Sequence, residues 1–318
     1  MIFIQLNNRN QLIYQAALLY YEDQKTQTEI ANVLQISRPT VAQFLKEARE
    51  GGIVQITISP NFSSSSEASK GLLEKYNLQT AIITPTEQSE QQTKANMGKA
   101  LAAFVEHRAY DLHSIGLGWG TTLHEFVQAA NPLPFGHLSI VPLMGGASIE
   151  SLHLHSNHLC FRLAEKYQAT VSYYYAPAIA DSPQQKQELM HSSFIKQAHK
   201  KALEVDLAIV SIGNPAQSST YKQLGVVSPE DEKDLLEKAV VGDALATFYD
   251  QDGQAVETSL SQRMVGISLE ELEMMNEVAI LASGKSKARS LFALLQKGCV
   301  DHIIIDQEVA EYLLAKEY

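Results

Sequence analysis

The 318-residue sequence contains only two cysteines, Cys160 and Cys299, and no long apolar run. Two thiols cannot form a disulfide framework or a four-thiolate zinc site within one chain. No run approaches the roughly 18 apolar residues that a membrane-spanning helix needs. The opening residues, Met1 to Gln5, lack the basic start and apolar stretch of a signal peptide. These absences predict a globular protein of the reducing cytoplasm, without membrane insertion.

Basic side chains are also few, with 25 Lys and Arg against 36 Asp and Glu, which gives a net charge of −11. The first 60 residues are neutral, because five basic side chains balance five acidic ones. The rest of the chain therefore carries the whole net charge. A broad positive field for nucleic acid is excluded, so any DNA contact must be local and repeated through oligomerisation.

The N-terminal region begins with two predicted helices. Apolar residues recur at helical spacing near residues 8–23, at Leu12, Ala16, Leu19 and Tyr20. Thr26 then fits the cap of a short second helix, with Glu29 three residues further on as its capping-box partner.

A third helix follows after a tight turn at Gln35–Ile36. Ser37 suits its N-cap, and Pro39 is tolerated in a first turn whose amides lack partners. Gly51–Gly52 ends this helix, and a strand is predicted over residues 53–58. A supporting helix followed by two short helices and a tight turn predicts a helix-turn-helix, whose last helix would lie in the DNA major groove.

The predicted recognition helix carries side chains suited to DNA. Arg38 has the fork geometry for guanine edges, Gln43 can pair with adenine, and Lys46 lies further along, toward the phosphate backbone. The full set of candidate DNA contacts is Gln27, Ser37, Arg38, Pro39, Thr40, Gln43, Lys46 and Arg49.

A serine-rich segment separates this module from a second domain. The predicted division is a helix-turn-helix domain over 1–58, a linker over 59–66, and a sugar-phosphate-binding and oligomerisation domain over 67–318. In the last part, helical patterns alternate with strand-like runs at 80–84, 114–117, 138–143, 171–175, 207–212, 278–282 and 302–305. This alternation predicts an α/β domain with a mostly parallel sheet, whose ligands bind beyond the carboxyl ends of the strands.

Three of the predicted strand-to-helix loops are rich in small residues, at 116–122, 145–148 and 283–287. Glycine lets a backbone approach a ligand closely, and the free amides of a helix N-terminus attract anions. Thr121 and Thr122 add hydroxyl groups to the first loop, which suits a phosphate. A single loop of this kind is equally typical of a plain tight turn.

Both predicted domains carry a family resemblance. The segment LLYYEDQKTQTEIANVLQISRPTVAQFLKEAREGGIVQITI resembles the DNA-binding head of the SorC family of sugar-binding transcriptional regulators. The large domain is similar to that family's effector domain in the motifs GLGWGTTL, VPLMGG, LHSNHL, VDLAIVSIGNP, VVGDALATFYDQDGQAV and KARSLFALLQKG. The resemblance implies a sheet related to the sugar-phosphate isomerase and CoA-transferase superfamily, and a sugar or sugar-phosphate ligand.

The resemblance also implies a set of effector-binding residues: Gly118, Trp119, Gly120, Thr121, Thr122, Gly145, Gly146, Asn157, Asp243 and Lys287. Asp243, in a predicted turn, could accept hydrogen bonds from sugar hydroxyls, and Lys287 could hold a phosphate. Met144 stands where some members place a lysine, so an imine at that position is not expected. Ser283 replaces the first glycine of the usual pair before the late helix.

Metal and nucleotide chemistry are not predicted. The spacing of His153, His155, His158 and Cys160 fits neither one helix face nor the usual zinc pairs. The loop GLGWG departs from the G-x-G-x-x-G pattern of dinucleotide-binding sites. A P-loop around Gly284 would need a glycine where Ala279 stands. No cofactor, metal or catalytic residue is therefore expected.

The sequence thus predicts a DNA-binding regulator of a carbohydrate operon, controlled by a phosphorylated sugar and acting as a dimer or tetramer. The alternative is a sugar-phosphate isomerase-like enzyme, which has no need of a helix-turn-helix. A metabolite-binding module without DNA contact is a third reading, which is favoured only if Arg38 and Gln43 are buried.

Overall fold

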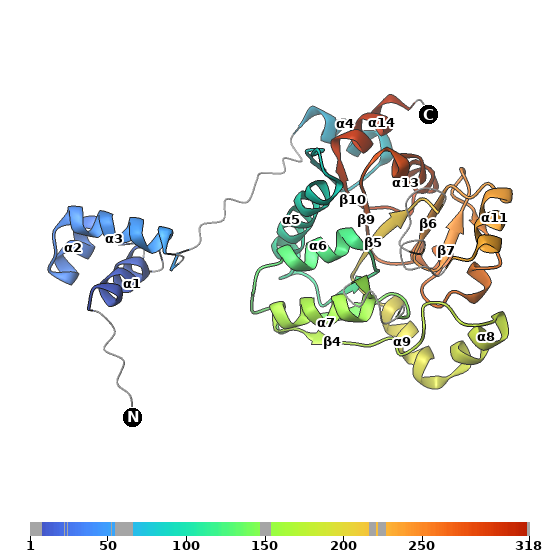
Figure 1. Ribbon diagram of the computed structural model, residues 1–318, viewed down its shortest axis with the longest axis horizontal. Helices are drawn as coiled ribbons and strands as arrows, with labels where there is room; N and C mark the ends of the chain where they lie inside the picture. Colours follow the sequence, from blue (N-terminus) through green and yellow to red (C-terminus); the bar gives the residue numbers. More distant parts are fainter. Residues whose placement is uncertain are drawn as a thin grey trace. The chain divides into compact units, whose positions relative to one another are not determined.

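The computed structural model describes residues 8–21, 23, 25–51, 53–54, 66–146, 154–215, 221 and 227–316. The chain divides into two compact units, residues 1–60 and 61–318 (Figure 1). Each unit is described by itself. In the described ranges, no helix combines the length and the apolar character needed to cross a membrane.

The N-terminal unit consists of three helices, α1 (Asn8–Tyr21), α2 (Gln27–Leu34) and α3 (Arg38–Glu50). The capping box predicted at α2 is present: Thr26 Oγ1 accepts from the Glu29 amide, and Glu29 Oε2 accepts from the Thr26 amide at 2.8 Å. Gln35 turns the chain between α2 and α3 with a φ of 53°. Ser37 Oγ then caps α3 by accepting from the Thr40 amide.

The buried face of α1 differs slightly from the predicted stripe. It is centred on Ile13, Ala16 and Ala17, which leaves Tyr20 37% exposed. The helices pack on one another through Ile13, Ala16, Ala17, Ile30, Ala31, Val41, Phe44, Leu45 and Ala48. Residues 53–54 form a bend rather than the start of a strand, and residues 55–58 lie outside the described residues.

The large unit contains the predicted parallel sheet, in the order β1-β10-β9-β5-β2-β3-β4. Its strands are β1 (Thr80–Thr84), β2 (Ser114–Leu117), β3 (Ser139–Pro142), β4 (Thr170–Val171), β5 (Leu207–Gly213), β9 (Val278–Ala282) and β10 (His302–Asp306). β4 ends earlier than predicted. The backbone of Tyr174 instead makes two hydrogen bonds with the side-chain amide of Asn157, at 2.8 and 3.0 Å.

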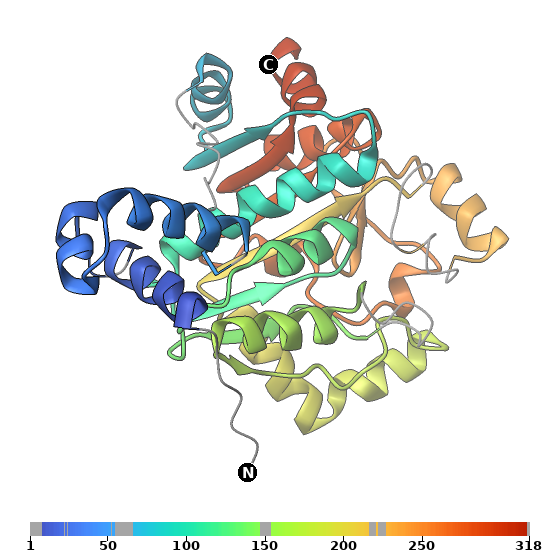
Figure 2. The ribbon, with the colours of Figure 1, turned by 60° about the vertical axis from the view of Figure 1, so that its left-hand side comes forward.

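Helices cover both faces of this sheet (Figures 1 and 2). One face carries α5 (Glu90–Arg108), α6 (Thr121–Ala129) and α7 (Ser156–Tyr167), and the other carries α4 (Glu67–Tyr76), α13 (Lys285–Lys297) and α14 (Gln307–Ala315). The two cores follow the alternation of strand side chains: Ile304 packs into the first core, and Ile303 and Ile305 into the second.

A small antiparallel extension pairs with the carboxyl end of β5. It consists of β6 (Gly242–Ala244), β7 (Thr247–Tyr249) and β8 (Ala255–Val256). Asp243, predicted in a turn, lies in the middle of β6 opposite Gly213 and is 4% exposed. The remaining short elements are α8 (Pro183–His191), α9 (Ser193–Leu203), α11 (Pro229–Glu237), η2 (Ser261–Arg263) and α12 (Leu269–Leu272).

A partly buried ion-pair cluster predicts how the stability of the large unit depends on acid pH. Arg108 and His302 both contact the carboxylate of Glu277, and these hydrogen bonds, led by that from Arg108, lower the pKa of Glu277 to about 2. The pKa of His302 is lowered as well, chiefly by burial. Both groups bind protons more readily in the unfolded chain, so stability should fall as the pH drops below about 6.5 and again between about 4.5 and 2.

Glu277→Gln should remove the loss of stability between about pH 4.5 and 2, which amounts to up to about 3 kcal/mol in the free energy of unfolding. The test is guanidinium unfolding across this pH range, followed by the fluorescence of Trp119, the single tryptophan. An acid dependence as steep in the variant as in the wild type would contradict the role given to Glu277.

Candidate functional site

The predicted DNA-reading side chains lie on the surface of the N-terminal unit. Arg38, Gln43 and Lys46 are exposed, as are Ser37, Pro39 and Arg49, whereas Thr40 and Gln27 are half-buried. The apolar residues of α3 face the opposite way, into the core of the unit. The third reading of the sequence, which buried Arg38 and Gln43 would favour, is therefore not supported.

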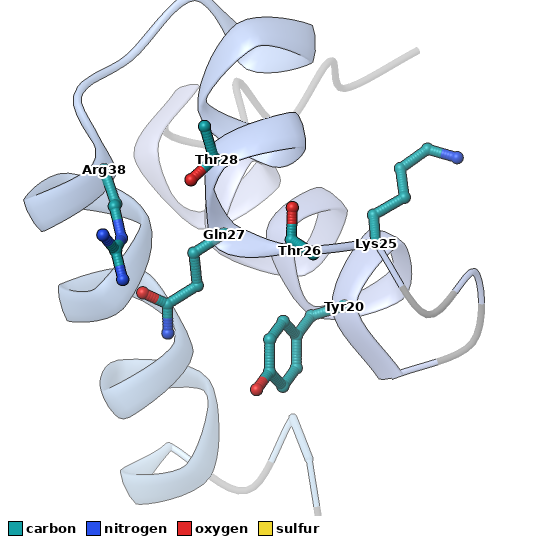
Figure 3. A pocket seen from close by; sticks show the side chains of 6 residues that line it. All are labelled: Tyr20, Lys25, Thr26, Gln27, Thr28 and Arg38. Carbon is teal, nitrogen blue, oxygen red and sulfur yellow. The ribbon is translucent and has the colours of Figure 1, made fainter.

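A cleft of about 550 Å³ lies where the first turns of α2 and α3 meet (Figure 3). It is lined by Tyr20, Lys25, Thr26, Gln27, Thr28 and Arg38. In Figure 3 the side chain of Gln27 extends from α2 toward α3, where Arg38 lies. Hydroxyl, amide and guanidinium donors beside a helix N-terminus suit the phosphate and base edges of DNA.

An acidic side chain also lies on α3. Glu47 Oε1 accepts from Gln43 Nε2 at 3.0 Å and from Arg9 Nη2 at 2.7 Å. These hydrogen bonds, with that from Gln43 the stronger influence, hold the pKa of Glu47 below its usual range. One of the two Nε2 protons of Gln43 is thus already bonded to Glu47, and the second proton and Oε1 remain for a base. The sequence pattern alone did not reveal this interaction.

The small-residue loops of the large unit meet at one edge of the sheet. β9, β5, β2 and β3 are consecutive neighbours and all parallel, so their carboxyl ends share this edge. The starts of α13 and α6 and the Gly145–Gly146 turn follow β9, β2 and β3 respectively. Ligand sites of open α/β sheets form at this kind of edge.

The turn into α6 has the geometry predicted from its glycines and threonines. Gly120 is the N-cap of α6 with a φ of 123°, a conformation that favours glycine, and no side chain caps the helix. Thr121 and Thr122 begin the helix, Thr121 half-buried and Thr122 buried. Uncapped amides and two hydroxyl groups are therefore positioned at this helix N-terminus, as an anion requires.

The other predicted residues of this region make different contacts within the protein. Gly118 donates its amide proton to the Ile209 carbonyl at 3.0 Å. Trp119 is 4% exposed and packs edge-on against Tyr221, with ring centroids 4.7 Å apart. Asn157 uses its amide to hold the Tyr174 backbone. Trp119 and Asn157 thus have clear packing roles, and their contact with an effector stays a prediction.

Lys287 is the strongest candidate for holding an anion. It is only 8% exposed, and no carboxylate in the described residues comes within ion-pair distance of its ammonium. Burial, together with the neighbouring charge of Lys94, lowers the pKa of Lys287 to about 8, although Asp243 and Glu90 oppose this shift. A buried ammonium without an ion-pair partner is stabilised by an incoming anion.

Asp243 and its surroundings complete this part of the edge. A side chain at Gly213 would place its Cβ 2.3 Å from Asp243 Oδ1, so the carboxylate packs directly over the Gly213 backbone. Ser283, just before α13, is 5% exposed, and its Oγ has no hydrogen-bond partner in the described structure. Neither residue is in the predicted set of effector-binding residues, although the loop that begins with Ser283 was one of the three predicted small-residue loops.

Lys94 of α5 is a further buried lysine, 7% exposed, and it is not in the predicted set of effector-binding residues. Lys94, Glu90 and Thr121 line a cleft of about 490 Å³, together with Gln91, His124, Glu125 and Leu154. A lysine in the middle of a helix pattern is usually a solvated surface residue, so only the fold shows that this one is buried.

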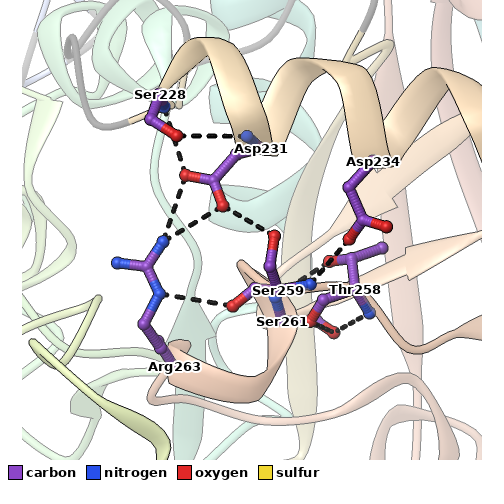
Figure 4. A network of polar contacts seen from close by, with 7 residues as sticks. All are labelled: Ser228, Asp231, Asp234, Thr258, Ser259, Ser261 and Arg263. Atoms are coloured by element: carbon purple, nitrogen blue, oxygen red, sulfur yellow. Dashed lines mark hydrogen bonds and ion pairs between the residues drawn. The ribbon is translucent and has the colours of Figure 1, made fainter.

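A second carboxylate, Asp231, is held in a polar network between α11 and η2 (Figure 4). Arg263 Nη2 donates to both carboxylate oxygens, at 3.1 and 3.2 Å, and Ser259 Oγ donates to Oδ1 at 2.8 Å. Burial alone would raise the pKa of Asp231, but hydrogen bonds from Ser259 and Ser228 lower it. Both oxygens are occupied, so the network anchors α11 rather than supplying a base for catalysis.

No cluster of three or more potential metal ligands occurs within the described ranges. His153 lies outside them. Cys160 is buried, which raises the pKa of its thiol and makes it a poor ligand.

Two family models match the chain. The family described as "Putative sugar-binding domain" matches residues 60–315, and the one described as "Helix-turn-helix domain" matches residues 15–56. The first match alone covers most of the chain. The two matches correspond to the two compact units of the structure.

Three relatives are similar over most of their own length. The deoxyribonucleoside regulator of Bacillus subtilis is 29% identical over 96% of this chain and 98% of its own. A DeoR family transcriptional regulator from Listeria monocytogenes is 31% identical, with a TM-score of 0.73, over 79% of this chain and all of that one. The full-length sorbitol operon regulator SorC from Klebsiella pneumoniae is 28% identical, with a TM-score of 0.81, over 96% and 98% of the two chains.

All three relatives are named as regulators and none as an enzyme, so the isomerase alternative is not retained. The resemblance seen in the sequence motifs is confirmed across both units. The chain is a helix-turn-helix transcriptional regulator and belongs to the SorC family of sugar-binding transcriptional regulators.

Proposed function

We propose that this regulator binds its operator through α3 and the cleft between α2 and α3, and that a phosphorylated sugar at the carboxyl edge of the sheet controls this binding. The observation that carries the proposal is the buried ammonium of Lys287, which has no ion-pair partner among the described residues and lies in the first turn of α13. The N-termini of α13 and α6, at the same edge of the sheet, both lack a side-chain cap. The phosphate would bind at these N-termini, and Asp243 would accept hydrogen bonds from the sugar hydroxyls.

DNA recognition is proposed to divide between base reading and phosphate contact. Arg38→Ala should weaken operator binding by about 1–3 kcal/mol and relax specificity, because a bidentate guanine contact discriminates between bases. Lys46→Ala should weaken binding to all sequences alike and reduce the salt dependence, because phosphate contacts release counterions. Fluorescence anisotropy on operator and random DNA, at several salt concentrations, measures both effects. Equal losses on the two DNAs for Arg38→Ala would refute its assignment to base reading.

The effector class can be tested before any operator is known. A panel of sugar phosphates and the matching unphosphorylated sugars is screened by thermal shift against the full chain. A ligand present at about 100 times its dissociation constant should add about 2.7 kcal/mol to the stability of the large unit. Stabilisation by phosphorylated members alone is the expected result, whereas stabilisation by neutral sugars alone would contradict the proposed effector class.

The proposed regulator acts as a homo-oligomer, either a dimer or a tetramer. The helix-turn-helix region is neutral and the rest of the chain is acidic, so long-range electrostatic attraction contributes little to DNA binding. Repeated contacts from several subunits must therefore supply the affinity. Light scattering of the full chain measures the molar mass and therefore the number of subunits. A monomer that nevertheless binds operator tightly would contradict this part of the proposal.

A further inference from the structure

The two side chains of the Glu90–Lys94 ion pair in α5 differ greatly in their exposure to water. The Lys94 side chain is 9% exposed and its ammonium lies 2.5 Å from Glu90 Oε1, whereas Glu90 is 67% exposed. A buried ammonium needs a counter-ion, but an exposed carboxylate is stabilised by water when it leaves. The pair can therefore open only if another anion reaches Lys94.

The surroundings of this pair show where such an anion would bind. Glu90 and Lys94 line the same cleft as Thr121, the first residue of α6. The N-cap of that helix, Gly120, offers no side chain to the free amides. Lys287 approaches from α13, close enough for its charge to interact with both Lys94 and Glu90. The Lys94 ammonium and the N-terminus of α6 thus border a cleft in which Glu90 supplies an exchangeable negative charge, and the charge of Lys287 acts on this pair from α13.

We propose that Lys94 is a second anchor for the effector's phosphate, which takes the place of the Glu90 carboxylate on the Lys94 ammonium. This inference rests on the proposed function, because it assumes an anionic ligand at this edge. A phosphate monoester brings close to two negative charges at neutral pH, against one from Glu90, so the exchange favours the ligand. An unphosphorylated sugar has no such charge and leaves the pair closed. Lys94 therefore makes the pocket select phosphorylated sugars.

Two substitutions on one helix should have opposite effects. Lys94→Gln removes the anchor and should weaken phosphate binding by about tenfold or more. Glu90→Gln removes the competing carboxylate and should strengthen binding several-fold. Lys99→Gln, at an exposed lysine of the same helix, is the matched control and should leave affinity unchanged. The measurement is isothermal titration of the full chain with inorganic phosphate, and with the tightest sugar phosphate from the thermal-shift panel.

Each outcome distinguishes this inference from the proposed function. If the wild type binds a sugar phosphate and Lys94→Gln binds it equally well, the anchor is wrong and the proposed function stands. If both substitutions weaken binding to the same extent, the pair only supports the structure of α5 and the exchange is wrong. If the wild type binds neither probe, the inference and the proposed effector class are both overturned.

Discussion

Lys287→Met should abolish the response to the effector while leaving the protein folded and able to bind DNA. Loss of a charge-assisted contact to phosphate costs about 1.5–3 kcal/mol, which weakens effector binding roughly 10- to 150-fold. Methionine keeps most of the side-chain volume and removes a buried charge, so the free energy of unfolding should stay level or rise. Effector titration and guanidinium unfolding of the same variant measure the two effects. Loss of stability together with affinity would instead indicate a structural lysine.

The pH dependence of effector binding provides a second readout of Lys287. Its pKa is about 8 in the free protein, so the ammonium is increasingly lost above this pH. Phosphate monoesters have their second pKa near 6 and keep a constant charge at higher pH. Affinity should therefore fall by up to about tenfold per unit above pH 8, and this fall should disappear in Lys287→Met.

The stability of the protein should change with pH in the opposite direction to its affinity for the effector. Between about pH 8 and pH 10.5 the unfolded chain holds the lysine proton and the folded chain has lost it, so the free energy of unfolding should rise with pH across this range. A wild-type affinity that stays constant through pH 9 would contradict the assignment of Lys287 to the phosphate.

Gly145→Ala should destabilise the large unit strongly, whereas Gly146→Ala should have little effect. A Cβ at Gly145 would lie 2.5 Å from the Pro177 carbonyl oxygen and 2.6 Å from that of Ala176, and backbone atoms cannot easily move away. The nearest atoms to a Cβ at Gly146 are side-chain nitrogens 3.7 Å away, which is ordinary contact. We expect a loss of about 1–3 kcal/mol or more for the first substitution and less than about 0.5 kcal/mol for the second.

Guanidinium unfolding followed by the fluorescence of the buried Trp119 measures both variants. Because Gly145 and Gly146 are adjacent, local differences in sequence cannot account for unequal effects. Similar losses in the two variants would mean that the turn after β3 is not fixed by the close backbone approach at Gly145. Retained effector binding in Gly146→Ala would show that this position tolerates a methyl group within the pocket.

Local chemistry made much of the fold predictable from sequence. Thr26 and Glu29 form a capping box because their types and spacing determine it. The strands at 80–84 and 278–282 were found at their observed bounds, because a buried parallel strand needs a continuous apolar run. The position of Asp243 was wrong, because the pairing of β6 with β5, about thirty residues earlier in the chain, is a long-range contact that overrides the local turn signal at Gly242.

The candidate site was predictable only where its residues follow strands. The loop at Gly120 could be identified because glycines and threonines after a strand indicate an anion-binding helix N-terminus. Lys94 could not, because its burial depends on the packing of α5 against α6, two helices that are separated in the sequence by β2. The contact between Gln43 and Glu47 was also missed, although its spacing of four residues on one helix is a recognisable signal.

Measuring operator binding with and without effector shows whether the effector controls the binding of DNA. DNA selected from a random library by the full chain supplies the operator, and anisotropy is measured for the wild type and Lys287→Met with the tightest sugar phosphate. The wild-type affinity should change about 5- to 150-fold on addition of the effector, the usual range of coupling between two sites. Lys287→Met should bind the same DNA as the wild type does without effector, and should not respond. An unchanged wild-type affinity at saturating effector would contradict the account.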